Sequence, residues 1–522
     1  MIKMVKIFID DKQLEVEEGL TILQAAEQAG IDIPHLCYHP AFPPEGSCRL
    51  CLVEIEGIPE LELSCSTKVR EGMKIQTKSQ KVIEARQGVL EFLLAEHPLD
   101  CPFCDKAGEC KLQDYYEEYG LFDSQFDEYK EKRDKKVKIG KNLILDRERC
   151  ILCTRCVRFL REVTKTQELG VFKRGIKSEI GIYNGFPVNN NYSGNLAEIC
   201  PVGAITDLDF RFKTRSWFLE KGNSICPLCS RGCNIQIEYH PGLGRFALPQ
   251  RVYRVKARQN MKVNSFWICD KGRYGYSYLD KNRTSKLVRP NINQKQDINW
   301  DEVLDYLTAK LKSLYFMNKT SQVALVLNSW LSNEELFLAR KIFNEDLKVT
   351  NIFFADLPDE EGDGFLLTSE RSPNKRGAKE IGWAYVPFTL EALAENKINC
   401  LLIFGSFFEQ LLNPAQLKSA LGSIETKILL SSHRPELESA FDLILPTAVI
   451  AEKEGSLTNT EGLVQGFSPA LPPWGESRAE WKILIELAKR LDINFAFYRR
   501  LSSPELIYQE MAEEIPFFRK EK

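Results

Sequence analysis

The chain has 522 residues, of which 43% are hydrophobic and 27% charged, and its 70 lysine and arginine residues nearly balance 73 acidic ones. This composition excludes a generally basic nucleic-acid-binding protein and a strongly acidic, solvated tail. No run of about 18 apolar residues occurs, so no membrane-spanning helix is expected, and the N-terminal residues turn polar too early to resemble a signal peptide.

Cysteine is the residue whose distribution is unusual. Fifteen of the 16 cysteines lie between Cys37 and Cys269, most of them in C-x-x-C pairs, and only Cys400 follows. Thiols spaced this closely favour a metal site, whereas a secreted disulfide scaffold is small and lacks a large cysteine-poor region. Because no export signal is apparent, we expect a reducing, cytoplasmic compartment.

Residues 1–82 contain the first group of candidate ligands. A hairpin of strands at residues 5–9 and 14–16 and a helix over residues 21–29 are predicted before them. The ligand spacing is C-x10-C-x2-C-x13-C, with a longer first gap than the plant-type 2Fe–2S pattern. The hairpin and helix still resemble a β-grasp ferredoxin, which favours a 2Fe–2S cluster over a four-cysteine zinc site. The four candidates are Cys37, Cys48, Cys51 and Cys65.

Residues 83–122 are predicted to form a helical segment that ends in the second ligand group, with the pattern H-x3-C-x2-C-x5-C. Three thiolates leave a four-iron cluster one ligand short, and an imidazole can complete it. A neutral ligand in place of a thiolate should raise the potential of the cluster. A zinc site with three cysteines and one histidine is the alternative. The candidates are His97, Cys101, Cys104 and Cys110.

Residues 142–215 follow a solvated connector at residues 127–141, where 11 of 15 side chains are charged. Three closely spaced cysteines and a remote Cys-Pro match the ligand pattern of one bacterial 4Fe–4S ferredoxin cluster. The cysteines of a second such cluster are absent, so we expect a ferredoxin-like domain with one 4Fe–4S cluster. The candidates are Cys150, Cys153, Cys156 and Cys200.

Residues 222–278 contain the fourth group, spaced C-x2-C-x3-C-x35-C, which suits another 4Fe–4S cluster, with a zinc ribbon as the alternative. Cys400 is left over and is expected to be a small buried hydrophobe. The candidates are Cys226, Cys229, Cys233 and Cys269.

Residues 280–522 change to alternating strands and helices, which predicts a mainly parallel α/β layer. The fold class expected for the whole chain is therefore α+β and multidomain. The predicted strands are residues 323–327, 351–354, 400–404, 427–431 and 442–445, with a helical stretch over residues 333–347.

In this order, the four groups resemble those of the G-type iron–sulfur component of bacterial NADH-quinone oxidoreductase, respiratory complex I. The fourth group, residues 270–273 and residues 452–465 resemble a molybdopterin oxidoreductase. The chain ends soon after residues 452–465, and no cysteine except Cys400 is available downstream to ligate molybdenum. The resemblance therefore implies that residues 280–522 are a shortened molybdopterin oxidoreductase-like α/β domain, and no molybdopterin is expected.

The resemblance implies an electron-relay subunit that passes electrons from a flavin-bearing, NADH-oxidising subunit toward quinone-side iron–sulfur subunits. It implies one 2Fe–2S and three 4Fe–4S clusters, and a peripheral place on the cytoplasmic side of the inner membrane with membrane contact only through partners. No nucleotide-binding G-x-G-x-x-G after a strand and no P-loop occur, so no substrate-converting site is expected on the chain itself.

Other functions stay open at this point. The same relay could serve a soluble NAD-linked or electron-bifurcating hydrogenase or formate dehydrogenase complex. A formate dehydrogenase catalytic subunit would need molybdenum or tungsten, and an iron-only hydrogenase would need further C-terminal cysteines. A zinc scaffold without redox function is the remaining alternative.

Overall fold

The computed structural model describes residues 3–121, 123–242, 250–290, 298–405 and 407–519. The chain divides into two compact units, Met1–Leu219 and Glu220–Lys522, and each is described by itself. The first unit contains the first three ligand groups, and the second unit contains the fourth. Within the described ranges, no helix is both long and apolar enough to cross a lipid bilayer.

The first unit opens with a five-stranded sheet in the order β2-β1-β5-β3-β4. Val5, Ile7 and Ile9 alternate with more exposed residues and point into its core, and Thr21 caps the following helix in a capping box. The predicted hairpin and helix are thereby confirmed. The elements are β1 (Met4–Ile9), β2 (Lys12–Glu17), α1 (Ile22–Gln28), β3 (Leu52–Ile55), β4 (Glu62–Leu63) and β5 (Lys74–Gln76).

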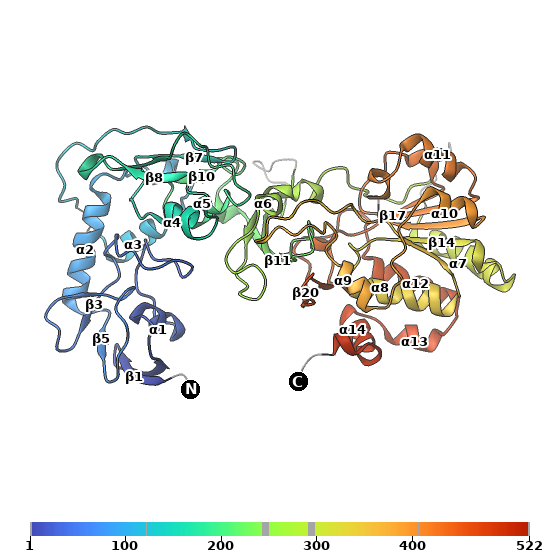
Figure 1. The fold of residues 1–522 in the computed structure, drawn as a ribbon, viewed down its shortest axis with the longest axis horizontal. Helices are drawn as coiled ribbons and strands as arrows, with labels where there is room; N and C mark the ends of the chain where they lie inside the picture. The colour runs from blue at the N-terminus through green and yellow to red at the C-terminus, as the bar shows by residue number, and fades with distance from the viewer. Residues whose placement is uncertain (1–2, 122, 243–249, 291–297, 406, 520–522) are drawn as a thin grey trace. The chain divides into compact units, whose positions relative to one another are not determined.

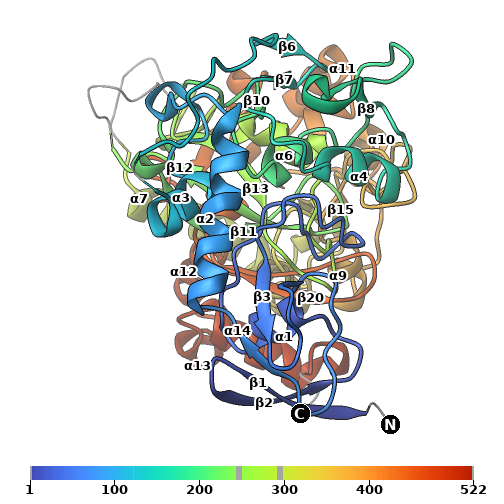
Figure 2. The ribbon, with the colours of Figure 1, turned by 90° about the vertical axis from the view of Figure 1, so that its left-hand side faces the viewer.

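A long helix, α2 (Gln80–Ala95), packs against β3 (Figure 2). Its buried Arg86 donates to the carbonyl of Leu52 and to the hydroxyl of Tyr119, which fixes α2 to the sheet and to the next helix. The helical segment before the second ligand group is confirmed. The elements that follow are η1 (Cys101–Phe103) and α3 (Lys111–Tyr119).

The remainder of the first unit surrounds the third ligand group with two small sheets, ordered β10-β7-β6 and β8-β9. The predicted connector at residues 127–141 is not irregular throughout, because Val137–Lys138 pairs with β7 and Ile139 is fully buried. The elements are β6 (Val137–Lys138), β7 (Leu143–Leu145), α4 (Arg155–Glu162), β8 (Leu169–Phe172), η2 (Gly175–Lys177), β9 (Glu179–Ile182), α5 (Asn195–Ile199), β10 (Ile205–Asp207) and η3 (Ser216–Phe218).

The second unit begins with a three-stranded antiparallel sheet, β11-β12-β13, which supports the fourth ligand group. A short helix follows the last of the four cysteines. The elements are β11 (Glu220–Ile225), β12 (Asn234–Tyr239), β13 (Val252–Ala257), α6 (Asp270–Tyr274) and η4 (Gly275–Leu279).

A parallel sheet in the order β15-β14-β16-β17-β18 forms the centre of the second unit. Its strands are buried on both faces: Val323, Leu325 and Leu327 face one helix layer, whereas Ala324 and Val326 face the other. Helices α7, α8 and α12 cover the first face, and α10 and α11 cover the second (Figure 1). The predicted parallel α/β layer is confirmed.

One predicted element differs in winding. The stretch at residues 333–347 begins as an α-helix but continues as the π-helical turn Arg340–Asp346. The remaining elements are α7 (Trp300–Phe316), η5 (Thr320–Gln322), β14 (Val323–Leu327), α8 (Asn333–Ala339), β15 (Asn351–Phe354), α9 (Lys375–Glu380), α10 (Leu390–Glu395), β16 (Cys400–Phe404), η7 (Phe407–Gln410), α11 (Pro414–Gly422), β17 (Thr426–Ser431), η8 (Glu438–Ala440), β18 (Leu443–Pro446), η9 (Ile450–Glu452), β19 (Gly455–Thr458), β20 (Val464–Phe467), α12 (Glu480–Leu491), α13 (Phe495–Arg500), α14 (Pro504–Glu514) and η10 (Pro516–Phe518).

Candidate metal centres

The first ligand group forms two thiol pairs on buried loops of the β-grasp sheet. Cys37 lies in hydrogen-bonding contact with Cys48, which lowers the pKa of Cys37, and Cys51 is paired with Cys65 in the same way. The backbone N–H of Leu36 donates to Cys48 Sγ at 3.4 Å. A 2Fe–2S cluster takes two thiolate ligands at each iron. The donor set and its division into two pairs therefore fit a two-iron cluster.

The second group gathers around one small cavity lined by His97, Cys101, Cys104 and Cys110. Burial lowers the pKa of His97 to about 4, so the imidazole is neutral, as a ligand must be. Its Nδ1 is buried and has no hydrogen-bond partner among the described residues. A buried, unsatisfied ring nitrogen beside three thiols fits the fourth ligand of a four-iron cluster.

Gly203 lies against the second group, although it follows the third group in the chain. A Cβ atom at this position would overlap with Cys104 Sγ, and it would lie 3.4 Å from Arg149 Cδ. Arg149 forms a bidentate ion pair with Asp100, at 2.6 and 2.7 Å. Glycine is therefore required here by a close approach, which the spacing of the sequence does not reveal.

The third group also lines one cavity, where Cys153, Cys156 and Cys200 are buried and Cys150 is half-buried. Burial raises the pKa of Cys150 to about 11 and that of Cys153 to about 12. Thiolates are costly in this apolar cavity unless a positive charge offsets them, and iron supplies that charge. The donors thus fit a four-iron cluster better than they fit free thiols.

Left-handed backbone conformations shape the loop between these cysteines. Leu152 and Thr154 have φ values of 53° and 57°, which non-glycine residues seldom adopt. Hydrogen bonds from the backbone of Leu152 and Arg155 lower the pKa values of Cys150 and Cys153, respectively, against the larger effect of burial. The loop conformation therefore directs N–H groups toward the thiols.

The fourth group is buried at one end of the antiparallel sheet of the second unit. Its buried thiols interact: Cys226, Cys229 and Cys269 all raise the pKa of Cys233, after the larger effect of burial. The Cys269 thiol caps α6 by accepting from the N–H of Gly272 at 3.3 Å. These four thiols fit a further four-iron cluster.

Among the described residues, no three His, Cys, Asp or Glu side chains are arranged to hold a single metal ion. The ligands of an iron–sulfur cluster bind different iron atoms and need not converge on one point. Cys400, the remaining cysteine, is fully buried in β16, as expected for a small hydrophobe.

A cavity of about 640 Å³ lies at the carboxyl edge of the parallel sheet of the second unit. Asn328, Gly405 and Ser432, which follow three of its strands, line the cavity, and so does Leu228 from the loop of the fourth group. Sequence analysis did not identify this cavity. The signal was available, because the carboxyl edge of an open parallel sheet is where ligands usually bind.

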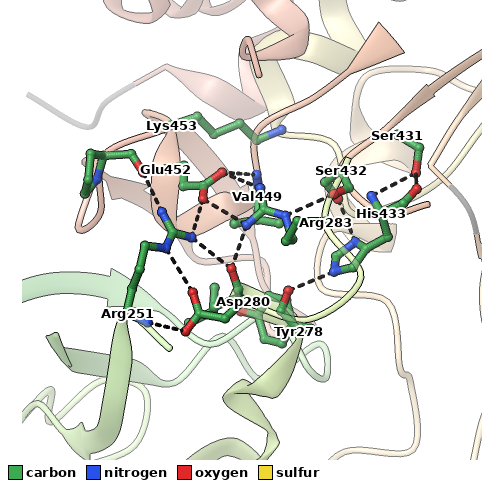
Figure 3. Close-up of polar contacts among 12 residues, drawn as sticks. Arg251, Tyr278, Asp280, Arg283, Ser431, Ser432, His433, Val449, Glu452 and Lys453 are labelled. Carbon is green, nitrogen blue, oxygen red and sulfur yellow. Dashed lines mark hydrogen bonds and ion pairs between the residues drawn. The ribbon is translucent and has the colours of Figure 1, made fainter. Parts of the chain in front are cut away.

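The charged side chains beside this cavity are paired with one another (Figure 3). Arg283 is fully buried and binds both carboxylate oxygens of Glu452, at 2.8 and 2.6 Å. Arg251 pairs with Asp280 at 2.9 Å and also with Glu452. His433 Nε2 donates to the carbonyl of Tyr278 at 2.8 Å.

A second buried ion-pair cluster reaches the same cavity. Lys453 Nζ lies 2.7 Å from a carboxylate oxygen of both Glu335 and Glu480, and the three side chains are nearly inaccessible to solvent. Lys453 and Glu480 line the cavity. The cations nearest to its interior are therefore already neutralised by this chain's own carboxylates, which does not suit an anionic dinucleotide cofactor.

Comparison with protein families gives five consecutive matches. They are a 2Fe-2S iron-sulfur cluster binding domain (residues 2–80), an NADH-ubiquinone oxidoreductase-G iron-sulfur binding region (86–125), the ferredoxin-like domain of NADH-quinone oxidoreductase subunit 3 (140–206), a molybdopterin oxidoreductase Fe4S4 domain (220–281) and molybdopterin oxidoreductase (371–490).

Individual relatives carry matching names. The chain is 38% identical to the NADH-ubiquinone oxidoreductase 75 kDa subunit of Reclinomonas americana, over 66% of this chain and 48% of that protein. It is 39% identical to the G-type component of the NADH-quinone oxidoreductase of Streptomyces coelicolor, over 58% of this chain and 35% of that protein. It is 29% identical to the mitochondrial NADH-ubiquinone oxidoreductase 78 kDa subunit of Candida albicans, over 94% and 83%.

A chain of an NAD+-reducing [NiFe]-hydrogenase is 34% identical and covers 41% of this chain and 91% of its own, with a TM-score of 0.38. The chain spans about half or less of the length of the first two relatives.

The fold and its ligand groups define an iron–sulfur protein, in which a 2Fe–2S domain is followed by 4Fe–4S domains and a molybdopterin oxidoreductase-like unit. These domains occur in mixed α and β structure, in the predicted order. The chain belongs to the family of the G-type iron–sulfur component of NADH-quinone oxidoreductase, whose mitochondrial relatives are the 75 and 78 kDa subunits.

Proposed function

We propose that this chain is the electron-relay subunit of an NADH-quinone oxidoreductase. It would receive electrons from a flavin-bearing, NADH-oxidising subunit and pass them toward quinone-side iron–sulfur subunits. The observation that carries the proposal is that fifteen cysteines and one histidine form four groups of four donors, each gathered at one place in the fold.

The ligands proposed are those predicted from the spacing of the sequence. A 2Fe–2S cluster binds to the first group, and three 4Fe–4S clusters bind to the second, third and fourth. When bound, the clusters accept and release single electrons. The chain's own residues exclude water from the thiols, keep His97 neutral and direct backbone N–H groups toward the sulfur atoms.

We further propose that no molybdopterin binds to the second unit. The basic side chains beside the 640 Å³ cavity are paired internally, so phosphate groups would have to displace buried carboxylates. A peripheral place on the cytoplasmic side of the inner membrane, reached through partner subunits, follows from the proposed role.

Metal analysis of anaerobically purified full-length protein tests this proposal. We expect about 14 iron atoms per chain and neither molybdenum nor tungsten. Replacing Cys200 with alanine should remove one four-iron EPR signal and about four iron atoms, while Cys400→Ala should change neither. Zinc in place of iron would contradict the relay function, and stoichiometric molybdenum or tungsten would contradict the proposal for the second unit. Co-purification with a hydrogenase or formate dehydrogenase instead of quinone-side subunits would identify a different complex.

Replacing His97 with cysteine tests the unusual ligand. A thiolate adds negative charge where the neutral imidazole stood, so the potential of this cluster should fall while its iron content stays the same. Redox titration followed by EPR measures the potential. The buried His35, which lies outside the four groups, provides the control: His35→Cys should leave this potential unchanged. An unaltered potential in His97→Cys would show that His97 is not a ligand.

A further inference from the structure

Two arginine side chains of α4, Arg155 and Arg158, are buried beside the first and third ligand groups. They are 7% and 2% exposed, respectively. Both come from the first turns of the helix that directly follows the cysteine loop of the third group. A guanidinium remains charged when buried, and its donors need acceptors with suitable geometry. Their hydrogen-bond partners therefore show what these side chains hold together.

The guanidinium of Arg158 bonds to the backbone of both groups. Its Nη2 donates to the carbonyl of Cys37 and, at 3.2 Å, to the carbonyl of Cys153. Its Nη1 donates to the carbonyl of Pro43 at 3.0 Å, in the loop between Cys37 and Cys48. One side chain thus joins a candidate ligand of the first group to a candidate ligand of the third.

Arg155 makes a second connection between the same groups. It donates to the carbonyl of Tyr38, the residue after Cys37, and to the carbonyl of Ile199 at 3.3 Å, the residue before Cys200. Carbonyl oxygens satisfy these arginine donors without removing the positive charge. Among the described residues, the carboxylate within ion-pair distance of Arg158 is that of Glu45, at the limit of 4.0 Å and 43% exposed.

We propose that Arg158 is a positioning residue that couples the cluster of the first group to the cluster of the third. It holds the two ligand loops at a fixed separation, and its buried charge raises the potentials of both clusters together. Reduction adds an electron to a cluster, and a nearby cation stabilises the added negative charge, the more so in a buried environment. This inference rests on the proposed cluster ligands.

The test uses the full-length, iron-loaded protein and three variants. Arg158→Gln removes the charge, Arg158→Lys keeps the charge but replaces the guanidinium fork with a single ammonium, and Arg161→Gln is the control. Arg161 lies on the same helix, is 54% exposed and pairs with Glu162. Redox titration followed by EPR gives the potential of each cluster, iron analysis gives its occupancy, and magnetic broadening between the two reduced clusters reports their separation.

In Arg158→Gln we expect both potentials to fall, with weaker magnetic broadening, whereas Arg161→Gln should match the unmodified protein. Arg158→Lys should show smaller shifts than Arg158→Gln, because the charge is retained. Unchanged potentials in Arg158→Gln, or a shift in one cluster alone, would overturn the inference.

If Arg158→Gln loses iron, Arg158→Lys decides. An ammonium cannot reproduce the guanidinium's bonds to both loops, so at least one of the two potentials should then lie below that of the unmodified protein. Two unchanged potentials would overturn the inference. The absence of both clusters from the unmodified protein would instead contradict the proposed function.

Discussion

Replacing Gly203 with alanine is expected to remove the cluster of the second group. The added Cβ atom would overlap with Cys104 Sγ and press on the side chains of Arg149 and Lys106. A cluster ligand displaced by even part of this overlap no longer reaches its iron atom, because ligand distances in metal sites tolerate only about 0.2 Å. We expect a loss of about four iron atoms per chain and of one four-iron EPR signal.

The control for this variant is Gly88→Ala in α2. Gly88 has no heavy atom within 4 Å of the position of an added Cβ, and alanine is preferred over glycine in a helix interior. Gly88→Ala should therefore keep its full iron content. Full iron in Gly203→Ala, with the potential of the second cluster unchanged, would show that the ligand group tolerates the side chain and would argue against its proposed geometry.

Replacing Lys453 with methionine is expected to destabilise the second unit by about 3–5 kcal/mol. The change removes the ammonium that lies 2.7 Å from both Glu335 and Glu480 and leaves two buried carboxylates facing each other. Burial already raises the pKa of Glu480 to about 7, and the charge of Lys453 acts against this increase. Urea unfolding followed by tryptophan fluorescence would measure the loss.

This prediction has a pH dependence with a defined sign. A carboxyl whose folded-state pKa is raised loses its contribution to stability as the pH rises from the unfolded value of about 4.5 through the folded value. Lys453→Met raises the pKa of Glu480 further, so the variant should be less destabilised at about pH 6 than at about pH 8. The exposed Lys418→Met on α11 should match the unmodified protein at both values. Equal stability of the two variants would contradict the assigned role of Lys453.

A second change separates charge repulsion from lost packing. Adding Glu480→Gln to Lys453→Met removes one of the two facing carboxylates. If repulsion dominates, the double variant should recover part of the lost stability, and the pH dependence should weaken. If the loss comes only from packing, the double variant should be no more stable than Lys453→Met.

The ligand groups and the elements that surround them could be predicted from local patterns. Cysteines two or three residues apart share one loop, so their spacing alone indicates a common metal site. The alternation of Val5, Ile7 and Ile9 predicted a strand, and the continuous apolar runs after residue 280 predicted a buried parallel sheet. In these cases a few neighbouring residues contain all the information needed.

The sequence by itself determined which residues can bind metal and in what order their domains occur. The tertiary structure alone decided what surrounds them: Gly203 reaches Cys104, Arg158 reaches Cys37, and Lys453 reaches Glu335 across more than 90 positions of the chain in each case. Such contacts depend on how distant segments pack and on which charges they bury together. No local spacing encodes that packing, because each partner has an ordinary polar or glycine pattern in its own segment.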